Sequence, residues 1–178
     1  MIFFTSDTHF QHANIIDYCK RPFANVEEMN ETIINNWNSV VTEEDKVIHV
    51  GDFSFGRFEK AEEIFNRLKG EKILIVGNHD EKWKNRYVKL FKEVHRGLSL
   101  EVDGIKIWLS HIPVQQITRE DTLYINGHVH EKWLFNNNRI NVGVDKHHFK
   151  LWSLDEIKKL WNEIKWIKKA ASLEDVTT

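Results

Sequence analysis

The sequence predicts an α/β domain built in layers, with either one mixed sheet or two facing sheets. Short β-rich segments alternate with helical periodicity in the first half, and the second half is mainly strands followed by one helix. The chain has 178 residues, the length of one domain, and its 41% hydrophobic residues are enough for one core. We therefore expect a single layered domain.

Seven segments are expected to be strands, because they are rich in β-branched and aromatic residues and are bounded by Gly, Asp or Asn. The dipeptide Asp103-Gly104 separates the fourth from the fifth and predicts a tight hairpin. The seven segments are Ile2–Thr5, Lys46–Val50, Lys72–Val76, Leu98–Val102, Ile105–Leu109, Thr122–Asn126 and Arg139–Val144.

Four segments have the 3.6-residue periodicity of amphipathic helices. Three of them are Val26–Val40, Arg57–Leu68 and the shorter Glu81–Phe91. The last helix starts at Ser153, where Ser153 and Glu156 have the spacing of a capping box, and continues through Ile167. We expect one domain over residues 1–170 and a polar, frayed tail over residues 171–178.

Charge and composition exclude several classes of protein. The net charge is only −2, so a nucleic-acid partner would need a local basic patch and no anionic membrane partner is indicated. Cys19 is the only cysteine, which excludes an intramolecular disulfide. The first residues lack the features of a signal peptide, and no apolar run approaches the ~20 residues of a membrane span. We expect a cytoplasmic location, and the sequence indicates no protein partner.

Metal-binding side chains follow the ends of five of the expected strands. Loops at strand ends are where layered α/β folds bind ligands, because the sheet fixes where each loop begins. We therefore expect these five segments to converge on one site. They are Asp7-Thr8-His9, Gly51-Asp52, Gly77-Asn78-His79-Asp80, Ser110-His111 and Gly127-His128-Val129-His130.

The spacing within these segments is suited to metal binding. In extended backbone, the two residues of each pair, Asp7 with His9 and His128 with His130, would project to one side. Asn78 and His79 are adjacent and would diverge, so one could bind metal while the other faces a substrate. The glycines before Asp52, Asn78 and His128 suit a tight turn or a close approach of backbone to ligand. Imidazole, carboxylate and amide donors together favour Mn, Fe, Ni or Zn over Ca or Mg.

These segments resemble the calcineurin-like metallophosphoesterase superfamily, whose signature runs DxH, GD, GNH[DE], H and GHxH. All five elements are present in this order, and the resemblance extends from residue 2 to about residue 145. It implies a four-layer sandwich of two mixed β-sheets flanked by helices. The stretch SDTHFQHANII is further similar to a small bacterial and phage branch of the superfamily.

The resemblance also implies a role for each residue. His79 would face the substrate and contact phosphate or protonate the leaving oxygen, and His12 would lie near the mouth of the site. The remaining seven would bind two divalent ions, of which manganese is the first expectation. Asp7, His9 and His130 would hold one ion, Asn78, His111 and His128 the other, with Asp52 bridging both.

The expected activity is hydrolysis of a phosphoric ester by a hydroxide that bridges the two ions. Two divalent ions, offset by Asp7, Asp52 and the hydroxide, leave about one positive charge, which suits a phosphodiester better than a monoester dianion. Phosphoprotein phosphatases of the superfamily continue GD as GDxVDRG, whereas this chain has Gly51-Asp52-Phe53-Ser54-Phe55-Gly56. The substrate is therefore expected to be a small phosphodiester or a nucleotide. The alternatives are a phosphomonoesterase, a nuclease or a non-catalytic interaction platform with the same fold.

Three other residues have two interpretations each. Arg21 precedes Pro22 and could reach a substrate phosphate, although an exposed turn arginine is the more ordinary interpretation. His49 lies within an expected strand, which favours a core histidine over a ligand. Asp145 follows the last expected strand, and a solvated turn is favoured over the rim of the site.

Overall fold

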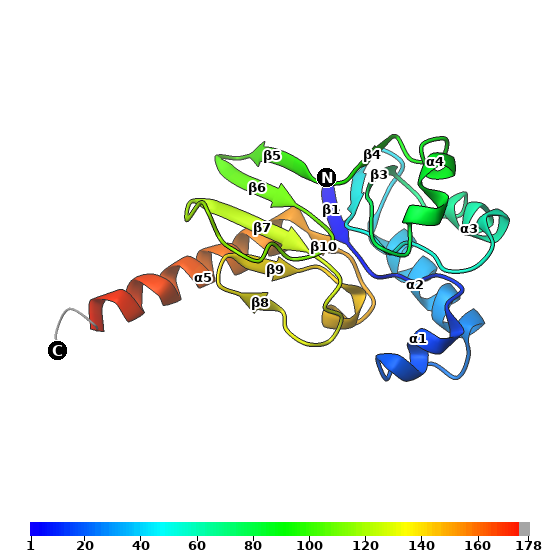
Figure 1. Cartoon of the computed structure of the whole chain (residues 1–178), viewed down its shortest axis with the longest axis horizontal. Coiled ribbons are helices and arrows are strands. Elements are labelled where there is room, and N and C mark those ends of the chain that lie inside the picture. Colours follow the sequence, from blue (N-terminus) through cyan, green and yellow to red (C-terminus); the bar gives the residue numbers. More distant parts are fainter. Residues whose placement is uncertain (175–178) are drawn as a thin grey trace.

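The computed structural model describes residues 1–174, with side chains described through Ala170. Two five-stranded sheets form the centre of the molecule (Figure 1). The strand order is β10-β1-β2-β3-β4 in the first sheet and β5-β6-β7-β9-β8 in the second. Both sheets are mixed, because each combines parallel pairs with at least one antiparallel edge strand. The predicted fold class, two mixed sheets with flanking helices, is confirmed.

The C-terminal ends of three parallel strands, β1, β2 and β3, lie at the same end of the first sheet. Parallel strands run in the same direction, so the loops after β1, β2 and β3 leave from the same side. Strand β10 pairs antiparallel with β1 at the opposite edge of the sheet from β4. The strands are β1 Ile2–Thr5, β2 Lys46–His49, β3 Glu71–Ile75, β4 Glu93–His95 and β10 Trp152–Ser153.

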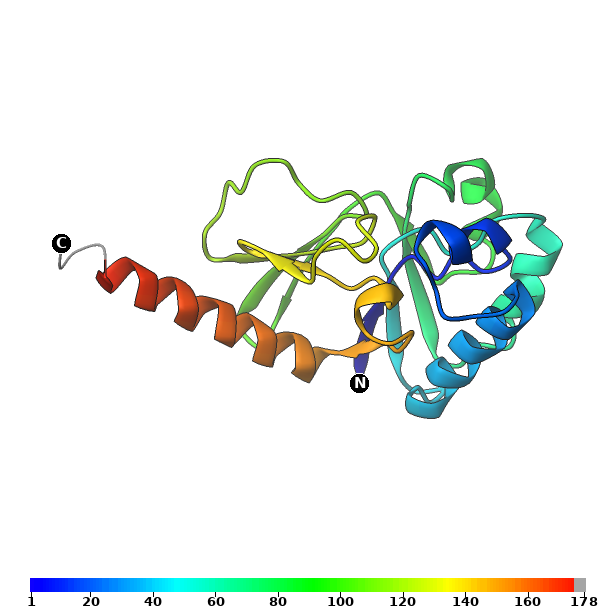
Figure 2. The ribbon, with the colours of Figure 1, turned by 90° about the horizontal axis from the view of Figure 1, so that it is seen from below.

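Four helices cover the face of the first sheet that points away from the second sheet (Figures 1 and 2). Helix α2 begins at Val26 because the Asn25 side chain accepts a hydrogen bond from Glu28 N at 2.8 Å. Its buried side chains, Met29, Ile33 and Trp37, recur every four residues and pack on the sheet. The helices are α1 Ala13–Tyr18, α2 Val26–Val40, α3 Phe58–Phe65 and α4 Lys84–Tyr87.

The second sheet is built on the predicted hairpin. Asp103 and Gly104 both have positive φ, 50° and 74°, as a type I′ turn between β5 and β6 requires. Strands β6, β7 and β9 are parallel, so their C-terminal ends also lie at one end of the second sheet. The strands are β5 Leu98–Val102, β6 Ile105–Leu109, β7 Thr122–Asn126, β8 Phe135–Asn136 and β9 Arg139–Asn141.

A second hydrophobic core fills the space between the two sheets. Helix α5, Leu154–Glu174, contributes to it and then extends beyond the sheets (Figure 1). The predicted capping box is confirmed, because Glu156 N donates to Ser153 Oγ at 3.2 Å and Ser153 N donates to Glu156 Oε2 at 2.7 Å. The buried members include Phe4, Ile48 and Ile75 from the first sheet, Ile107, Leu123 and Ile125 from the second, and Ile157, Trp161 and Ile164 from α5.

The structure differs from the predicted elements mainly where segments are short. Helix α1 and strands β4, β8 and β10 were not predicted, because two to six residues are too few to show a period. Strand β9 ends at Asn141, and the 3-10 helix Val144–Lys146 begins where the predicted strand ended. Helix α5 continues through Glu174, into the segment predicted as tail, and residues 175–178 lie outside the described residues. No described helix is long and apolar enough to cross a bilayer.

Candidate metal centre

The loops after β1, β2 and β3 meet the loops after β6 and β7 where the two sheets come together. A parallel bridge between Ser6 and Gly143 joins the sheets at this point. Ser6 N donates to Val142 O at 3.2 Å, and Val144 N donates to Ser6 O at 3.1 Å. This bridge brings together side chains that are more than a hundred residues apart in the sequence. His128 N, for example, donates to the Asp7 carboxylate at 3.0 Å.

Five of the seven predicted ligands have left-handed backbone, so the expectation of extended DxH and HxH segments is wrong. Their φ angles are 56° for Asp7, 47° for His9, 57° for Asp52, 70° for His128 and 47° for His130. Asp and His tolerate this region better than branched residues, but each still costs roughly 1–3 kcal/mol of strain. Such strain concentrates at functional sites, where the surrounding structure holds it in place.

Two glycines leave room for the carboxylates, as the sequence predicted. A Cβ atom at Gly77 would collide with Oδ1 of Asp52, and a Cβ atom at Gly127 would lie 2.5 Å from Oδ2 of Asp7. Carbon and oxygen atoms that are not bonded do not approach this closely. Glycine at these positions therefore lets backbone from one loop pack directly on a carboxylate of another.

The first group of donor atoms comes from Asp7, His9 and His130. One donor atom of each lies within 4.8 Å of the others, close enough to surround a single ion. The His130 Nε2 atom is 3.9 Å from Asp7 Oδ1, and the His9 Nε2 atom is 3.5 Å from Asp52 Oδ2. These are the three residues that the resemblance implied for the first ion, and their binding of an ion stays a prediction.

The second group comes from Asp52 and His111, with Asn78 and His128 beside them. Asp52 Oδ2 is 3.2 Å from His111 Nε2, so the same oxygen lies between His9 and His111. Asn78 Oδ1 is 3.1 Å from His111 Nε2 and 3.1 Å from His128 Nδ1. Asp7 also belongs to a group with Asp52 and His111, which links the two halves of the centre.

Two atoms indicate that this constellation fits metal ions better than hydrogen bonding among its own members. His9 Nε2 is buried and has no hydrogen-bond partner among the described residues. His111 uses Nδ1 to donate to Val50 O at 2.8 Å, so in a neutral ring Nε2 is an acceptor that faces two other acceptors, Asp52 Oδ2 and Asn78 Oδ1. A divalent cation satisfies such a group of lone pairs, whereas a buried orphaned donor or acceptor is costly.

The histidines of the centre differ widely in pKa because their charged neighbours differ. Burial lowers the pKa of His111, but its hydrogen bond to Asp52 and the charges of Asp7 and Asp52 raise it to about 9. Burial also lowers the pKa of His130, and the hydrogen bonds to Asp145 and Cys19 raise it to about 10. His9 behaves oppositely, because burial lowers its pKa to about 2. His111 and His130 thus carry protons at neutral pH that a metal ion would displace.

His79 is close to the centre but is separate from both donor groups. Its backbone N–H donates to Asp52 Oδ1 at 2.9 Å, whereas Oδ2 of Asp52 faces His9 and His111. The His79 ring is half-buried, and its centroid is 5.2 Å from that of His9. The backbone of His79 is therefore fixed, and its imidazole lies beside the candidate ion sites. The resemblance implied this position, and a contact with substrate stays a prediction.

Arg21 does not contact substrate space, and both interpretations of it from the sequence are wrong. Its side chain is fully buried and every contact is internal. Nε donates to Asp145 Oδ1 at 2.8 Å, while the terminal nitrogens donate to Asp7 O at 2.7 Å and Thr8 O at 3.1 Å. The guanidinium therefore holds the strained backbone of the loop that carries Asp7 and His9.

Asp145 joins Arg21 to the centre. The sequence favoured a solvated turn for this residue, but its side chain is buried. Its Oδ2 atom accepts from Arg21 at 2.9 Å and is 3.1 Å from His130 Nδ1. A carboxylate on one imidazole nitrogen orients the other nitrogen toward a metal. The Cys19 thiol lies within 4.8 Å of donor atoms of both His130 and Asp145. Because Arg21 and Asp145 are 124 residues apart, no local pattern could have identified this pair.

Asp80, the last residue of the GNHD segment, holds two loops together. Oδ2 accepts from Asp52 N at 2.7 Å and from Gly77 N at 2.8 Å, and Oδ1 accepts from Phe53 N at 3.0 Å. Burial and the charge of Asp52 raise its pKa to about 6, although these three donors oppose the shift. The motif was recognised in the sequence, but this structural role for its aspartate was not.

His12 lies at the edge of the centre. It is 8% exposed, and its Nδ1 is 3.2 Å from Nδ1 of His9. Its ring stacks on the exposed Phe55 at 4.1 Å, and Phe55 meets His79 edge-on at 5.4 Å. A pocket of about 300 Å³ is lined by Asn78 and His111 and not by His12. A substrate contact by His12 stays a prediction.

His49 is a core histidine, as the sequence favoured. It is fully buried, and its Nε2 is 2.9 Å from Thr8 Oγ1. The Thr8 hydroxyl also donates to Phe53 O at 2.7 Å, so this contact ties the loop after β1 to the loop after β2.

Known proteins share both the sequence and the architecture of this chain. An uncharacterised protein of Methanocaldococcus jannaschii is 43% identical over 169 residues, covering 89% of this chain and 90% of that protein. The Gene 66 protein of Mycobacterium phage L5 is 29% identical over 196 residues, covering 90% and 94%. The crystal structure of an Aquifex aeolicus protein of unknown function is similar with a TM-score of 0.75 at 31% identity, covering 90% of this chain and 98% of that one.

The architecture is that of a phosphoesterase. It combines two mixed sheets with Asp, Asn and His side chains gathered where the sheets meet. The family model of the calcineurin-like phosphoesterase superfamily domain matches residues 1–145. The chain belongs to this superfamily, as the resemblance of its motifs predicted. The family is one of hydrolases that are generally metal-dependent, and the groups of acidic and histidine side chains described above could bind such metals.

Proposed function

We propose that this protein is a dinuclear metal-dependent phosphodiesterase acting on nucleotides or other small phosphodiesters. The observation that carries the proposal is the position of Asp52 Oδ2, 3.5 Å from His9 Nε2 and 3.2 Å from His111 Nε2. A carboxylate oxygen that lies between two sets of donor atoms could be a ligand of both of two neighbouring ions. This supports Asp52 as the bridging ligand.

The two ions would be held by ligands from both sheets. Asp7, His9 and His130 form the first set, and Asn78, His111 and His128 form the second. When bound, such ions supply Lewis acidity and a nucleophilic water of lowered pKa. The mixed nitrogen and oxygen donors favour manganese first, with iron, nickel or zinc as alternatives.

The protein's own groups would position the ester and its leaving oxygen. His79 is fixed through its backbone N–H on Asp52, so its imidazole can donate a proton or a hydrogen bond to the leaving oxygen beside the ions. Asp80 holds the backbone of Asp52 and Gly77, which keeps the two loops in register during turnover. Catalysis would thus rest mainly on prearranged charge and orientation.

The charge of the loaded centre favours a diester. Asp7 and Asp52 are the only carboxylates among the seven proposed ligands, so two divalent ions leave a small positive excess, about one charge once the nucleophile is counted. A diester monoanion neutralises that excess, whereas a monoester dianion exceeds it. Asp145, which contacts His130, is already paired with Arg21.

The test is a comparison of esters with the same leaving group. Protein reconstituted with Mn²⁺ should hydrolyse bis(p-nitrophenyl) phosphate faster than p-nitrophenyl phosphate at saturating metal, and each chain should contain two ions by elemental analysis. A faster monoester reaction would establish the phosphomonoesterase instead. Two bound ions with neither activity would favour the interaction platform.

A nuclease would share this chemistry and differ in substrate. Such an enzyme needs a basic, aromatic-lined groove that follows a nucleic-acid backbone. The same protein should therefore be assayed on a dinucleotide and on single-stranded RNA. We expect the dinucleotide to be cleaved, and no increase in kcat/KM with strand length. Cell fractionation would test the cytoplasmic location, which stays a prediction.

A further inference from the structure

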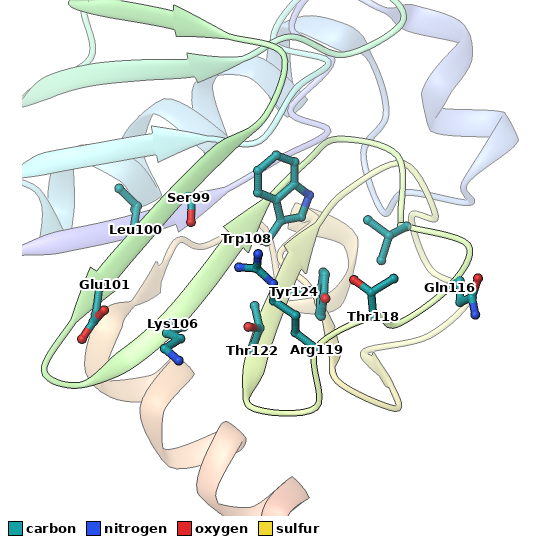
Figure 3. Close-up of a pocket in the computed structure, with 11 residues that line it drawn as sticks. Ser99, Leu100, Glu101, Lys106, Trp108, Gln116, Thr118, Arg119, Thr122 and Tyr124 are labelled. Atoms are coloured by element: carbon teal, nitrogen blue, oxygen red, sulfur yellow. The ribbon is translucent and has the colours of Figure 1, made fainter.

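A second and larger pocket lies on the outer face of the second sheet. Its volume is about 920 Å³, and strands β5, β6 and β7 form its floor while the segment 110–121 forms one wall (Figure 3). None of its lining residues belongs to the candidate metal centre. Pockets of this size, lined by aromatic side chains and a few convergent polar groups, are typical of small-molecule sites.

Hydrogen bonds to the neighbouring strand hold the wall of this pocket in place. Arg139 Nε donates to Val114 O at 2.8 Å, and its terminal nitrogen donates to Gln115 O at 2.9 Å. At the other end of the segment, Asn138 Nδ2 donates to Glu120 O at 2.9 Å. The segment is therefore anchored on both sides of residues 116–119, and the pocket is part of the fold.

Trp108 provides an aromatic surface on the floor. A Cβ atom at Gly97 would lie only 2.7 Å from Cζ2 of Trp108, so the indole lies directly against the backbone of the neighbouring segment. Ser99, opposite Trp108 on β5, is also small. Tyr124 is opposite Trp108 on β7, so two aromatic side chains lie side by side on the floor. An indole supported on one side and open to the pocket is suited to stacking with a planar ring.

Arg119 is the charged group of this pocket that lacks an acidic partner among the described residues. Lys106, by contrast, is paired with Asp121 at 2.6 Å. The Arg119 side chain extends from the wall toward Lys106 and Trp108 (Figure 3). Asp121 and, more weakly, Glu101 raise the pKa of Lys106, and the positive charge of Arg119 opposes this, so Arg119 lies near Lys106. The carboxylates of Asp121 and Glu101 act on Lys106, so an anion bound in the pocket would find its partner in Arg119.

We propose that this pocket binds a nucleoside monophosphate, with the base stacked on Trp108 and the phosphate bound by Arg119. A planar ring matches the indole, and a single phosphate matches the one guanidinium without an acidic partner. Glu101 lines the β5 side of the pocket and can accept hydrogen bonds from ribose hydroxyls. The proposal does not depend on the activity assigned to the metal centre.

The test uses metal-free protein, so that ions in the candidate centre cannot bind the phosphate. Isothermal titration calorimetry in excess chelator should detect binding of AMP and weaker binding of adenosine or inorganic phosphate alone. Arg119→Gln should weaken AMP binding roughly tenfold or more, the usual effect of losing a charged hydrogen bond. Trp108→Leu should weaken it about fivefold or more through lost stacking.

Matched controls are available elsewhere in the chain. Arg57→Gln removes an exposed arginine near α3, and Trp166→Leu removes an exposed tryptophan from α5, so both should bind AMP like the wild type. Arg119 is exposed, and its variant should fold normally even if Trp108→Leu does not. Hydrogen exchange should show AMP-dependent protection in residues 112–124.

Three results would overturn the proposal. The first is an absence of AMP binding at millimolar concentration, and the second is equal affinity in Arg119→Gln and Arg57→Gln. The third is protection confined to the loops around residues 78 and 128, which would place the nucleotide at the metal centre. A failure of ester hydrolysis leaves all three measurements unaffected, so the two proposals are tested separately.

Discussion

At the scale of single residues, the candidate centre depends on which nitrogen of each histidine is occupied. His111 uses Nδ1 on Val50 O, and His130 uses Nδ1 on Asp145, so both present Nε2 toward the carboxylates. The sequence identified both histidines but gave no information about these partners. The partners fix the orientation of each ring before any ion binds, which is how proteins prearrange metal sites.

The role proposed for His79 can be tested separately from metal binding. We predict that His79→Ala retains two ions per chain and loses at least about 100-fold in kcat, the usual range for a general acid. The loss should be smallest for substrates with good leaving groups, because these need least protonation. His95→Ala, which removes a surface histidine paired with Glu93, is the control and should leave kcat unchanged. Loss of metal in the His79 variant would contradict the assignment.

The role of Arg21 can be tested against an exposed pair with similar geometry. Arg21→Ala removes the arginine partner of the buried Asp145 carboxylate and leaves it only His130, so we expect a loss of about 3–5 kcal/mol in the free energy of unfolding. Arg67 makes a two-pronged contact with Glu31 on the surface, and Arg67→Ala should cost less than about 1 kcal/mol. Urea titration followed by circular dichroism measures both values, and equal losses would argue against the inferred role of Arg21.

At the scale of elements, the centre is built from loops whose backbones touch the carboxylates of other loops. The strands place the starting points, and the glycines before Asn78 and His128 let the chains approach each other. Asp80 and the Thr8–His49 contact then join the loops after β1, β2 and β3. Each loop is therefore held by its neighbours more than by its own sequence.

Gly77→Ala tests this arrangement directly. The added methyl group would collide with Asp52, so Mn²⁺ affinity should fall at least about tenfold, the usual effect of disturbing the support of a ligand. Gly104→Ala is the control, since no other described residue beyond its two chain neighbours comes within 4 Å of its Cβ position. That variant should lose about 1–2 kcal/mol of stability through its positive φ but retain metal affinity. Metal titration compares the two, and normal affinity in Gly77→Ala would contradict the predicted collision.

At the scale of the whole molecule, the candidate centre joins the two sheets. Asp7, His9, Asp52 and Asn78 come from loops of the first sheet, whereas His111, His128 and His130 come from the second. Bound ions would therefore link the two halves of the fold. A ligand that binds only the folded state raises stability by mass action, by about 2.7 kcal/mol at a concentration 100 times Kd.

This stabilisation should depend on pH in a defined direction. His111 and His130 have raised pKa values of about 9 and about 10 in the metal-free protein. Their contribution to stability is complete below the unfolded value of about 6.5 and is lost as pH rises through the folded values. The affinity for metal rises over the same range. Metal binding displaces the protons of His111 and His130, and they are displaced more easily as pH rises.

We therefore expect the increase in Tm on adding Mn²⁺ to grow between pH 6.5 and about 9. Thermal unfolding with Mn²⁺ and with chelator measures the difference. Calorimetry in buffers of different ionisation enthalpy should also show proton release on metal binding at pH 7. A Tm increase that falls with rising pH would contradict the histidine assignments.

The sequence predicted the elements that depend on local chemistry. Three features were recognisable because each depends on residues a few positions apart. They are the Asp103-Gly104 turn, the Ser153–Glu156 capping box and the helical periodicity of α2. It failed for α1, β4, β8 and β10, which are too short to show a period. It also misjudged the backbone of the DxH and HxH segments, since their left-handed conformation is imposed by contacts with other loops.

The sequence by itself determined the family, the fold class and the seven donor residues that we propose as metal ligands, because the type, order and spacing of these residues are local properties. Only the tertiary structure decided how they are held: the oxygen of Asp52 between His9 and His111, the buried Arg21–Asp145 pair behind His130, and the pocket over Trp108. Each of these depends on residues distant in the sequence, brought together where the two sheets pack and where one loop folds back over a sheet. Contacts of this kind leave no periodicity or motif in the chain.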